Sequence, residues 1–152
     1  MIKKTINFDL DGTVCNLYAV DSWLEKLRAY DASPYEDAEP LVNLSSLAFY
    51  IHKAQKNGWK VNVISWLSKE PTAEYDEEVA EAKLDWLAEH LPSVQFDEIF
   101  IVPYGTPKAS LASGVLFDDE RPNRENWNKA SGENVAFDAV GMLEILHDLL
   151  AA

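Results

Sequence analysis

The stretch Phe8-Asp9-Leu10-Asp11-Gly12-Thr13 ends a short apolar run with two carboxylates one residue apart, followed directly by a glycine. Side chains at positions i and i+2 of a strand project to the same side, so Asp9 and Asp11 are expected to converge where the strand stops. Two close carboxylates repel unless a cation lies between them or one holds a proton. Gly12 permits a sharp turn because it lacks a Cβ. The stretch therefore predicts an acidic site at a sheet edge, although an Asp-Gly pair after apolar residues is also typical of a hairpin turn.

Length and composition indicate a single globular domain. The chain has 152 residues, of which 47% are apolar, enough for one sizeable core. Thirteen Lys and Arg against twenty-six Asp and Glu give a formal charge of −13. Such a field repels polyphosphate backbones, so we expect no duplex nucleic acid partner. A small phosphorylated substrate remains compatible, because a metal ion and one lysine can reverse the sign of the potential locally.

Cysteine content and hydropathy bear on location. The single cysteine, Cys15, rules out an intramolecular disulfide and is typical of a reducing compartment. No leader segment and no apolar run of membrane-spanning length is visible. We therefore expect a cytoplasmic protein without a membrane partner.

Apolar periodicity predicts helices that alternate with strands. Strands are expected at residues 6–8, 61–65, 98–102, 115–117 and 134–137. Helices are expected at residues 16–30, 44–57, 74–91 and 142–150, and residues 31–40 are expected to form a proline-punctuated loop. Strands that are near-continuous apolar runs between helices predict an α/β fold. This would be a three-layer α/β/α, Rossmann-like arrangement in which helices cover both faces of a five-stranded parallel sheet.

Polar residues collect at the predicted strand ends. In an open α/β sheet, ligands bind at the carboxyl ends of the strands. The first strand leads into Asp9 and Asp11, the second ends in Ser65, and the fourth leads into Asp118-Asp119, with Lys108 before it. The sequence thus predicts a site that combines two acidic clusters, a hydroxyl and a lysine.

This set of residues resembles the motifs of the haloacid dehalogenase-like (HAD) superfamily of phosphotransferases. The first motif of that family, DxD followed by Gly and Thr, matches residues 9–13. Its second, third and fourth motifs match Ser65, Lys108 and Asp118-Asp119. The resemblance implies a strand order of 3-2-1-4-5 and a small helical cap insertion at about residues 14–42.

The run from Val115 to Phe137 is similar to the tail of small 5'(3')-deoxyribonucleotidase-like members, many of them phage-associated. Two positions depart from that pattern. Ser131-Gly132 stands where a glycine pair is usual, and Asn123 lies near the place of a later acid.

The resemblance implies roles for the acidic residues. Asp9 would be the nucleophile that forms an aspartyl-phosphate, and Asp11 the general acid that protonates the leaving alcohol and later activates water. Mg²⁺ would be held by the Asp9 carboxylate, the Asp11 backbone carbonyl and Asp118. Asp119 would bind the ion directly or through water.

The remaining motif residues would bind substrate. Ser65 would hydrogen-bond a phosphate oxygen together with backbone N–H groups around Asp11 and Trp66, and Lys108 would screen the negative charge. Four aromatic residues are candidates to stack on a ring of the substrate, although core packing is the preferred interpretation of the second: Tyr18, Trp23, Tyr35 and Trp66.

The sequence thus predicts a magnesium-dependent phosphomonoesterase acting on a small phosphorylated metabolite, for which a nucleoside 5'-monophosphate is one candidate. One alternative is a receiver-like signalling domain, in which the acidic pair would end the first strand and the phosphoacceptor would come mid-chain. Another is a catalytically idle HAD-like binding protein. Each residue also has a structural interpretation: Ser65 could cap a turn, Lys108 could be a solvated surface lysine, and Asp118-Asp119 could form a turn.

Overall fold

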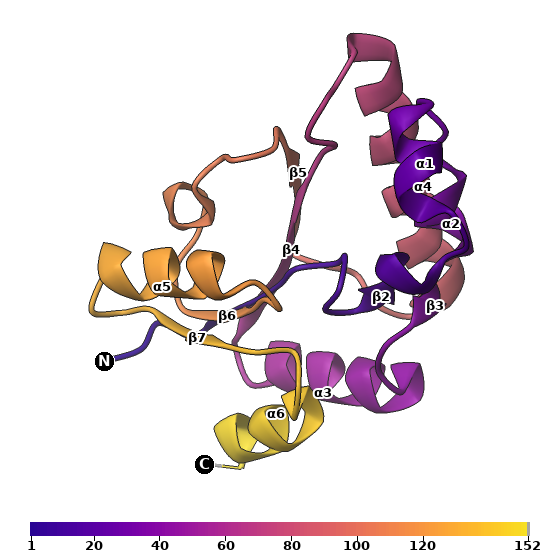
Figure 1. The fold of residues 1–152 in the computed structure, drawn as a ribbon. Helices are drawn as coiled ribbons and strands as arrows, with labels where there is room; N and C mark the ends of the chain where they lie inside the picture. The colour runs from indigo at the N-terminus through magenta and orange to yellow at the C-terminus, as the bar shows by residue number, and fades with distance from the viewer. Residues whose placement is uncertain (152) are drawn as a thin grey trace.

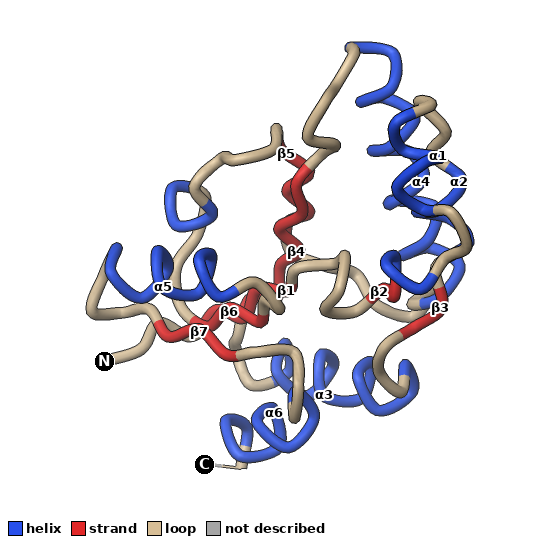
Figure 2. The backbone as a smooth tube through the Cα atoms, viewed as in Figure 1, coloured by secondary structure: helices blue, strands red, loops and turns tan. Residues whose placement is uncertain are grey.

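The computed structural model describes residues 1–151 and has a five-stranded, all-parallel sheet at its centre (Figure 1, Figure 2). Its strands are β1 (Thr5–Phe8), β4 (Lys60–Trp66), β5 (Glu98–Val102), β6 (Val115–Phe117) and β7 (Val135–Phe137). They lie in the order β5-β4-β1-β6-β7, which is 3-2-1-4-5 when the five are numbered along the chain. The predicted α/β class, parallel sheet and strand order are therefore confirmed.

Helices cover both faces of this sheet. Alternate strand residues point to opposite faces, and on each face they pack with helix residues in a separate apolar cluster. Ile6, Phe8 and Val63 belong to the larger cluster, with residues of α3 (Leu44–Lys56), α4 (Ala73–His90) and α6 (Met142–Leu150). Ile64 and Leu116 point to the other face and meet α5 (Arg121–Ala130) and the short 3-10 helix η2 (Lys108–Ser110). Figure 1 shows α5 and α6 on opposite sides of β7.

The connection between β1 and α3 differs from the prediction. A continuous helix at residues 16–30 is wrong, and so is the expectation that residues 31–40 are only a loop. The chain instead forms β2 (Cys15–Asn16), η1 (Leu17–Ala19), α1 (Trp23–Arg28), α2 (Ser33–Asp37) and β3 (Glu39–Pro40).

Three features of the backbone explain the difference. Cys15 and Asn16 pair in antiparallel fashion with Pro40 and Glu39, so they are not available to a helix. Ser22 lies in the left-handed region with φ 56°, which separates η1 from α1. Pro34 lies in the first turn of α2, where its fixed φ suits a helix start.

The other helix boundaries follow local chemistry. Asn43 accepts a hydrogen bond from the backbone N–H of Ser46 and caps α3, as its position in the sequence predicts. Thr72 caps α4 in the same manner through the N–H of Tyr75. Among residues 1–151, no helix is both long enough and apolar enough to cross a membrane.

Candidate active site

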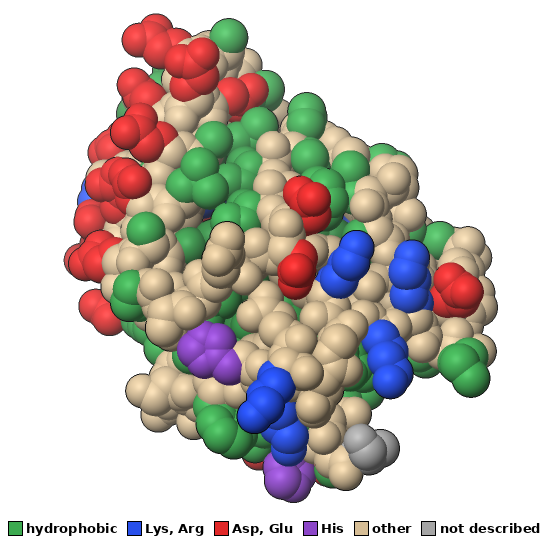
Figure 3. All heavy atoms as spheres, turned by 180° about the vertical axis from the view of Figure 1, so that it is seen from behind, with side chains coloured by type: hydrophobic (Ala, Val, Ile, Leu, Met, Phe, Trp, Pro, Cys, Tyr) green, Lys and Arg blue, Asp and Glu red, His purple; other side chains and the backbone are tan. Residues whose placement is uncertain are grey.

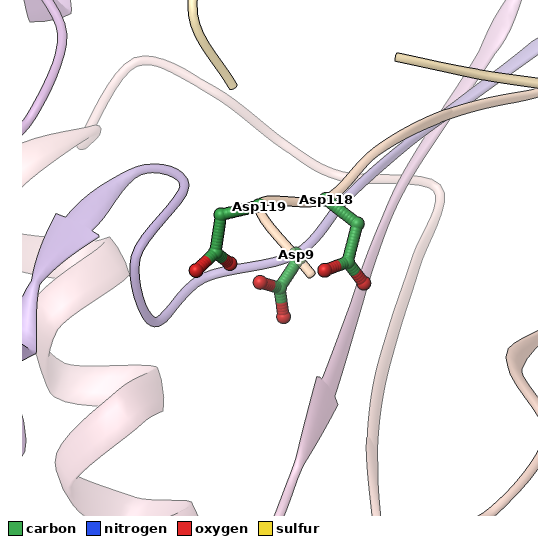
Figure 4. Close-up of side chains that lie close together, drawn as sticks. All are labelled: Asp9, Asp118 and Asp119. Atoms are coloured by element: carbon green, nitrogen blue, oxygen red, sulfur yellow. The ribbon is translucent and has the colours of Figure 1, made fainter. Parts of the chain in front are cut away.

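Asp9 and Asp118 are brought together by the pairing of two neighbouring strands. Phe8 of β1 lies opposite Phe117 of β6 in the parallel register, so the next residue on each strand emerges at the same sheet edge. Asp9, Asp118 and Asp119 each offer a carboxylate oxygen within 4.8 Å of the others. Figure 4 shows the three carboxyl groups side by side. The sequence-based expectation that the two acidic motifs meet is confirmed.

Lys108 partly neutralises this group of carboxylates. Its Nζ lies 2.9 Å from Asp9 Oδ1 and 2.8 Å from Asp118 Oδ2. The residue is 5% exposed, so the interpretation as a solvated surface lysine is wrong. The lysine reaches the site because η2 carries it into the edge beside β6, between Asp9 and Asp118.

The three carboxylates carry more negative charge than the single ammonium of Lys108 can neutralise. Burial raises the pKa of Asp9 to about 7, although attraction to Lys108 opposes this rise. Burial also raises the pKa of Asp118 and of Asp119. For Lys108, burial lowers the pKa but attraction to Asp9 and Asp118 outweighs this effect, so the ammonium is retained. The site therefore favours either a shared proton or a bound cation. Its donor set consists of carboxylate oxygens, which suits a hard cation such as Mg²⁺.

Thr13 and Gly12 fix the positions of two of the carboxylates. The Thr13 hydroxyl lies 3.0 Å from Asp9 Oδ2 and 3.2 Å from Asp119 Oδ1, and it accepts a hydrogen bond from the Asp119 N–H. Gly12 has φ +82°, and a Cβ at this position would overlap the Asp119 carboxyl group. The tight turn after Asp11 therefore creates the space that Asp119 occupies.

The Asp11 carboxylate points to a different partner. It forms an ion pair with Lys83 of α4, at 2.9 Å between Nζ and Oδ2, and it is not part of the three-carboxylate group found in residues 1–151. Coordination of a metal by its backbone carbonyl stays a prediction. Sequence reasoning missed Lys83. The signal was present, because Val79, Lys83 and Trp86 follow one another at helical spacing on the buried side of α4.

Ser65 and Trp66 end β4 at the same edge. Ser65 is 1% exposed, and its Oγ lies 2.6 Å from Lys83 Nζ. The Trp66 carbonyl accepts from the same ammonium at 2.7 Å, and its indole N–H donates to the Thr106 carbonyl at 2.8 Å. Trp66 therefore lines the cavity described below, whereas Ser65 is buried beside Lys83, and binding of substrate by either residue stays a prediction.

α5 supports the acidic cluster from the side of β6. The Asn123 side chain donates to Asp118 Oδ2 at 3.2 Å, and Arg124 donates to the Asp118 backbone carbonyl at 3.0 Å. Asn123, which stands near the usual place of a later acid, therefore acts on Asp118 as a hydrogen-bond donor. Neither contact was predicted from the sequence.

A cavity of about 460 Å³ lies at this edge of the sheet, next to the acidic residues and Lys108. Asp9, Asp11 and Lys108 contribute to its floor. Its walls are mainly aromatic and apolar, and include all four of the aromatic residues singled out in the sequence: Leu17, Tyr18, Trp23, Leu24, Leu27, Tyr35, Trp66, Leu67 and Tyr104. Trp23 also packs against the small cluster around Leu17 and Tyr75, so it serves both the core and the cavity.

Surface charge is uneven around this cavity. Acidic side chains gather along one edge of the molecule (Figure 3), and α4, with the sequence AEYDEEVAEAKLDWLAEH, carries seven Asp and Glu residues. Within this acidic helix, Lys83 is the basic residue that turns inward to the site.

Comparisons with known proteins do not identify a family for this chain. No protein-family model matches the chain, and no curated protein matches its sequence. A solved structure of an uncharacterized protein from Corynebacterium glutamicum ATCC 13032 Kitasato is similar, with 16% sequence identity, coverage of 97% of this chain and 95% of that chain, and a TM-score of 0.49. At this level, the likeness carries no argument about activity.

Proposed function

We propose that this chain is a magnesium-dependent phosphomonoesterase with HAD-like chemistry. The observation that carries the proposal is the environment of Asp9. Its carboxylate stands among two further carboxylates and one buried lysine, at the rim where parallel sheets bind ligands, and beneath a cavity. A phosphoryl group requires a nucleophile and positive charge at one place, and this arrangement supplies both.

Asp9, Asp118 and Asp119 would hold the Mg²⁺, which when bound neutralises charge on the phosphoryl oxygens. An Asp9 carboxylate oxygen attacks phosphorus, and the bond between phosphorus and the ester oxygen breaks. Asp11 gives a proton to the departing alcohol. A water molecule then attacks the aspartyl-phosphate, Asp11 takes the proton from this water, and inorganic phosphate leaves while the Asp9 carboxylate is regenerated.

The cavity indicates which substrates fit. Its charged end is formed by Asp9 and Lys108, while its aromatic walls suit an apolar or ring-bearing leaving group. A small phosphorylated metabolite, such as a nucleoside 5'-monophosphate, has this division between a charged and a planar part. In the proposal, α1 and α2 serve as the minimal cap that provides Trp23, Leu27 and Tyr35.

One observation favours a second candidate, a phosphoacceptor protein without turnover. The Asp11 carboxylate is held by Lys83. If this ion pair kept Asp11 from taking the proton of the attacking water, Asp9 would accept a phosphoryl group without releasing it. The two candidates differ in whether turnover is sustained.

The test is hydrolysis of p-nitrophenyl phosphate and of a panel of nucleotides and sugar phosphates, with Mg²⁺ or with EDTA. We expect activity with Mg²⁺ only, and a fall in kcat of roughly 1000-fold or more in Asp9→Asn, because the nucleophile is lost. Asp85→Asn, which changes an exposed residue of α4, serves as the control and should match the wild type. Full activity of Asp9→Asn, or of the wild type in EDTA, would contradict the proposal.

A further inference from the structure

Lys83 is a fully buried cation for which the motifs of the sequence give no role. It is 2% exposed and comes from the middle of α4. Its Nζ contacts three oxygens, at 2.9 Å to Asp11 Oδ2, 2.6 Å to Ser65 Oγ and 2.7 Å to the Trp66 carbonyl. An ammonium has three N–H donors and no acceptor, so these contacts use its full capacity.

These contacts decide the direction of the Ser65 hydrogen bonds. Because Lys83 can only donate, Ser65 Oγ must be the acceptor of their hydrogen bond. The hydroxyl proton of Ser65 is then left for a different acceptor, and no bond donated by this hydroxyl is found within residues 1–151. Lys83 thereby leaves the Ser65 hydroxyl with a proton to donate, while Ser65 itself is 1% exposed and is not among the described residues that line the cavity.

The same ammonium fixes the Asp11 carboxylate. Lys83 contacts Oδ2 of Asp11, while the Asp11 side chain stays 19% exposed and lines the cavity. The ring of Tyr35, from α2, lies 4.9 Å from Lys83 Nζ and covers the ammonium from the cap side. The lysine is therefore enclosed by groups that favour its charge, and it has no remaining N–H with which to bind substrate.

We propose that Lys83 is a positioning residue that acts through Asp11 and Ser65, setting one as the acid for the leaving group and the other as a donor to phosphate. This inference rests on the proposed function. It places Lys83 one contact away from the reacting atoms, in contrast with Lys108, which contacts the nucleophile Asp9 itself.

The leaving group provides the readout that separates this role from a purely structural one. The value of kcat/KM reports steps up to departure of the alcohol, and an alkyl alkoxide needs the proton from Asp11 far more than p-nitrophenolate does. We expect Lys83→Met to lower kcat/KM for an alkyl phosphate on the order of 100-fold. For p-nitrophenyl phosphate, the loss of kcat/KM should be about 10-fold or smaller. Lys129→Met, at an exposed lysine of α5, is the matched control and should change neither value.

A double-mutant cycle tests whether the effect passes through Asp11. In an Asp11→Asn background, adding Lys83→Met should lower kcat/KM for the alkyl phosphate only by the smaller factor seen with p-nitrophenyl phosphate, about tenfold or less, because the acid that Lys83 positions is already lost and only the effect through Ser65 remains. An equal loss on both substrates in the single variant, or an undiminished loss in the Asp11→Asn background, would overturn the inference.

A second measurement does not depend on the stability of any variant. A crystal structure of the wild type with Mg²⁺ and beryllofluoride, a phosphoryl mimic, should show Lys83 still bonded to Asp11 and Ser65, and the Ser65 hydroxyl donating to the mimic. Lys83 contacting the mimic directly would overturn the positioning role. An active wild type with an inactive Asp9→Asn variant would leave the proposed function standing in that case, whereas a fully active Asp9→Asn variant would remove both.

Discussion

The buried Asp9 carboxylate lies close to the Lys108 ammonium and to the carboxylates of Asp118 and Asp119, so its charge depends on its neighbours. In the protein without metal, its pKa of about 7 lies above the ordinary value of 3.8. Between these two values the folded state holds a proton that the unfolded state releases. The contribution of Asp9 to the free energy of unfolding therefore falls as the pH rises from about 4 to about 7.

Because Asp9 destabilises the folded protein as the pH rises, the stability of Asp9→Asn relative to the wild type should depend on pH. In EDTA at pH 8, the variant should be more stable than the wild type by roughly 2–4 kcal/mol, because the cost of the buried charge is gone. At pH 4 the difference should disappear. Urea unfolding at both pH values measures it, with Asp85→Asn as the control. A stability difference that is the same at pH 4 and pH 8 would contradict the raised pKa of Asp9.

The lack of a side chain at Gly12 leads to a prediction about the Asp119 carboxylate. Gly12 and Gly58 have φ of +82° and +86°, but a Cβ at Gly12 meets the Asp119 carboxyl group, whereas a Cβ at Gly58 meets nothing within 4 Å. Both alanine variants bear the same backbone strain. Gly12→Ala should in addition displace Asp119 and raise the Mg²⁺ concentration for half-maximal activity on the order of 10-fold. Titration of activity with Mg²⁺ measures this, and equal values for the two variants would contradict it.

Single residues differ in how well the sequence predicted them. Asp9 and Asp118 directly follow strands and Ser65 lies at the end of one, so strand prediction alone places them at one edge. Lys83 belongs to a helix, and its direction depends on which face of α4 is buried. Asn123 and Arg124 depend on how α5 turns back over β6. These three required the tertiary arrangement.

Among the elements, α4 connects the sheet to the segment between β1 and α3. The indole N–H of Trp86 donates to the backbone carbonyl of Ala38 at 2.8 Å, and the two residues are 1% and 2% exposed. The Tyr75 hydroxyl likewise donates to the Asp31 carbonyl at 3.2 Å. The walls of the cavity that come from α1 and α2 are therefore held in place by α4.

Trp86→Phe tests this connection. The change keeps an aromatic ring but leaves the buried Ala38 carbonyl without a donor, so we expect the free energy of unfolding to fall by roughly 2 kcal/mol. Leu84→Ala, at a residue of α4 that is 46% exposed, should cost about 0.5 kcal/mol or less. Urea unfolding of both variants provides the comparison. Equal losses would contradict the role assigned to the Trp86 hydrogen bond.

Sequence patterns were sufficient to predict the long helices but not the short elements. The long helices α3 and α4 have clear apolar stripes and side-chain caps, and both were predicted within a few residues. The segment from Cys15 to Pro40 was not, because its short elements are determined by a two-residue strand pairing and by the left-handed conformation of Ser22. Neither leaves a periodic signal.

For the whole molecule, the sheet topology explains how residues distant in the sequence form one site. β1 lies in the middle of the sheet between β4 and β6, so the ends of these three strands bring Asp9, Ser65 and Asp118 to one edge. The alternation of strands and helices predicted a parallel sheet, and the order of its strands was predicted only through the family resemblance. The four aromatic residues named from the sequence line the cavity, but the short helices α1 and α2 that shape it were not predicted.

In the proposed function, Asp9 accepts a phosphoryl group from the substrate. The wild type should be mixed with p-nitrophenyl phosphate and Mg²⁺, quenched in acid during turnover, and digested for mass spectrometry of its peptides. We predict one phosphoryl group on Asp9, absent without Mg²⁺ and absent in Asp9→Asn. Sustained turnover with the phosphoryl group on a different residue would contradict the account.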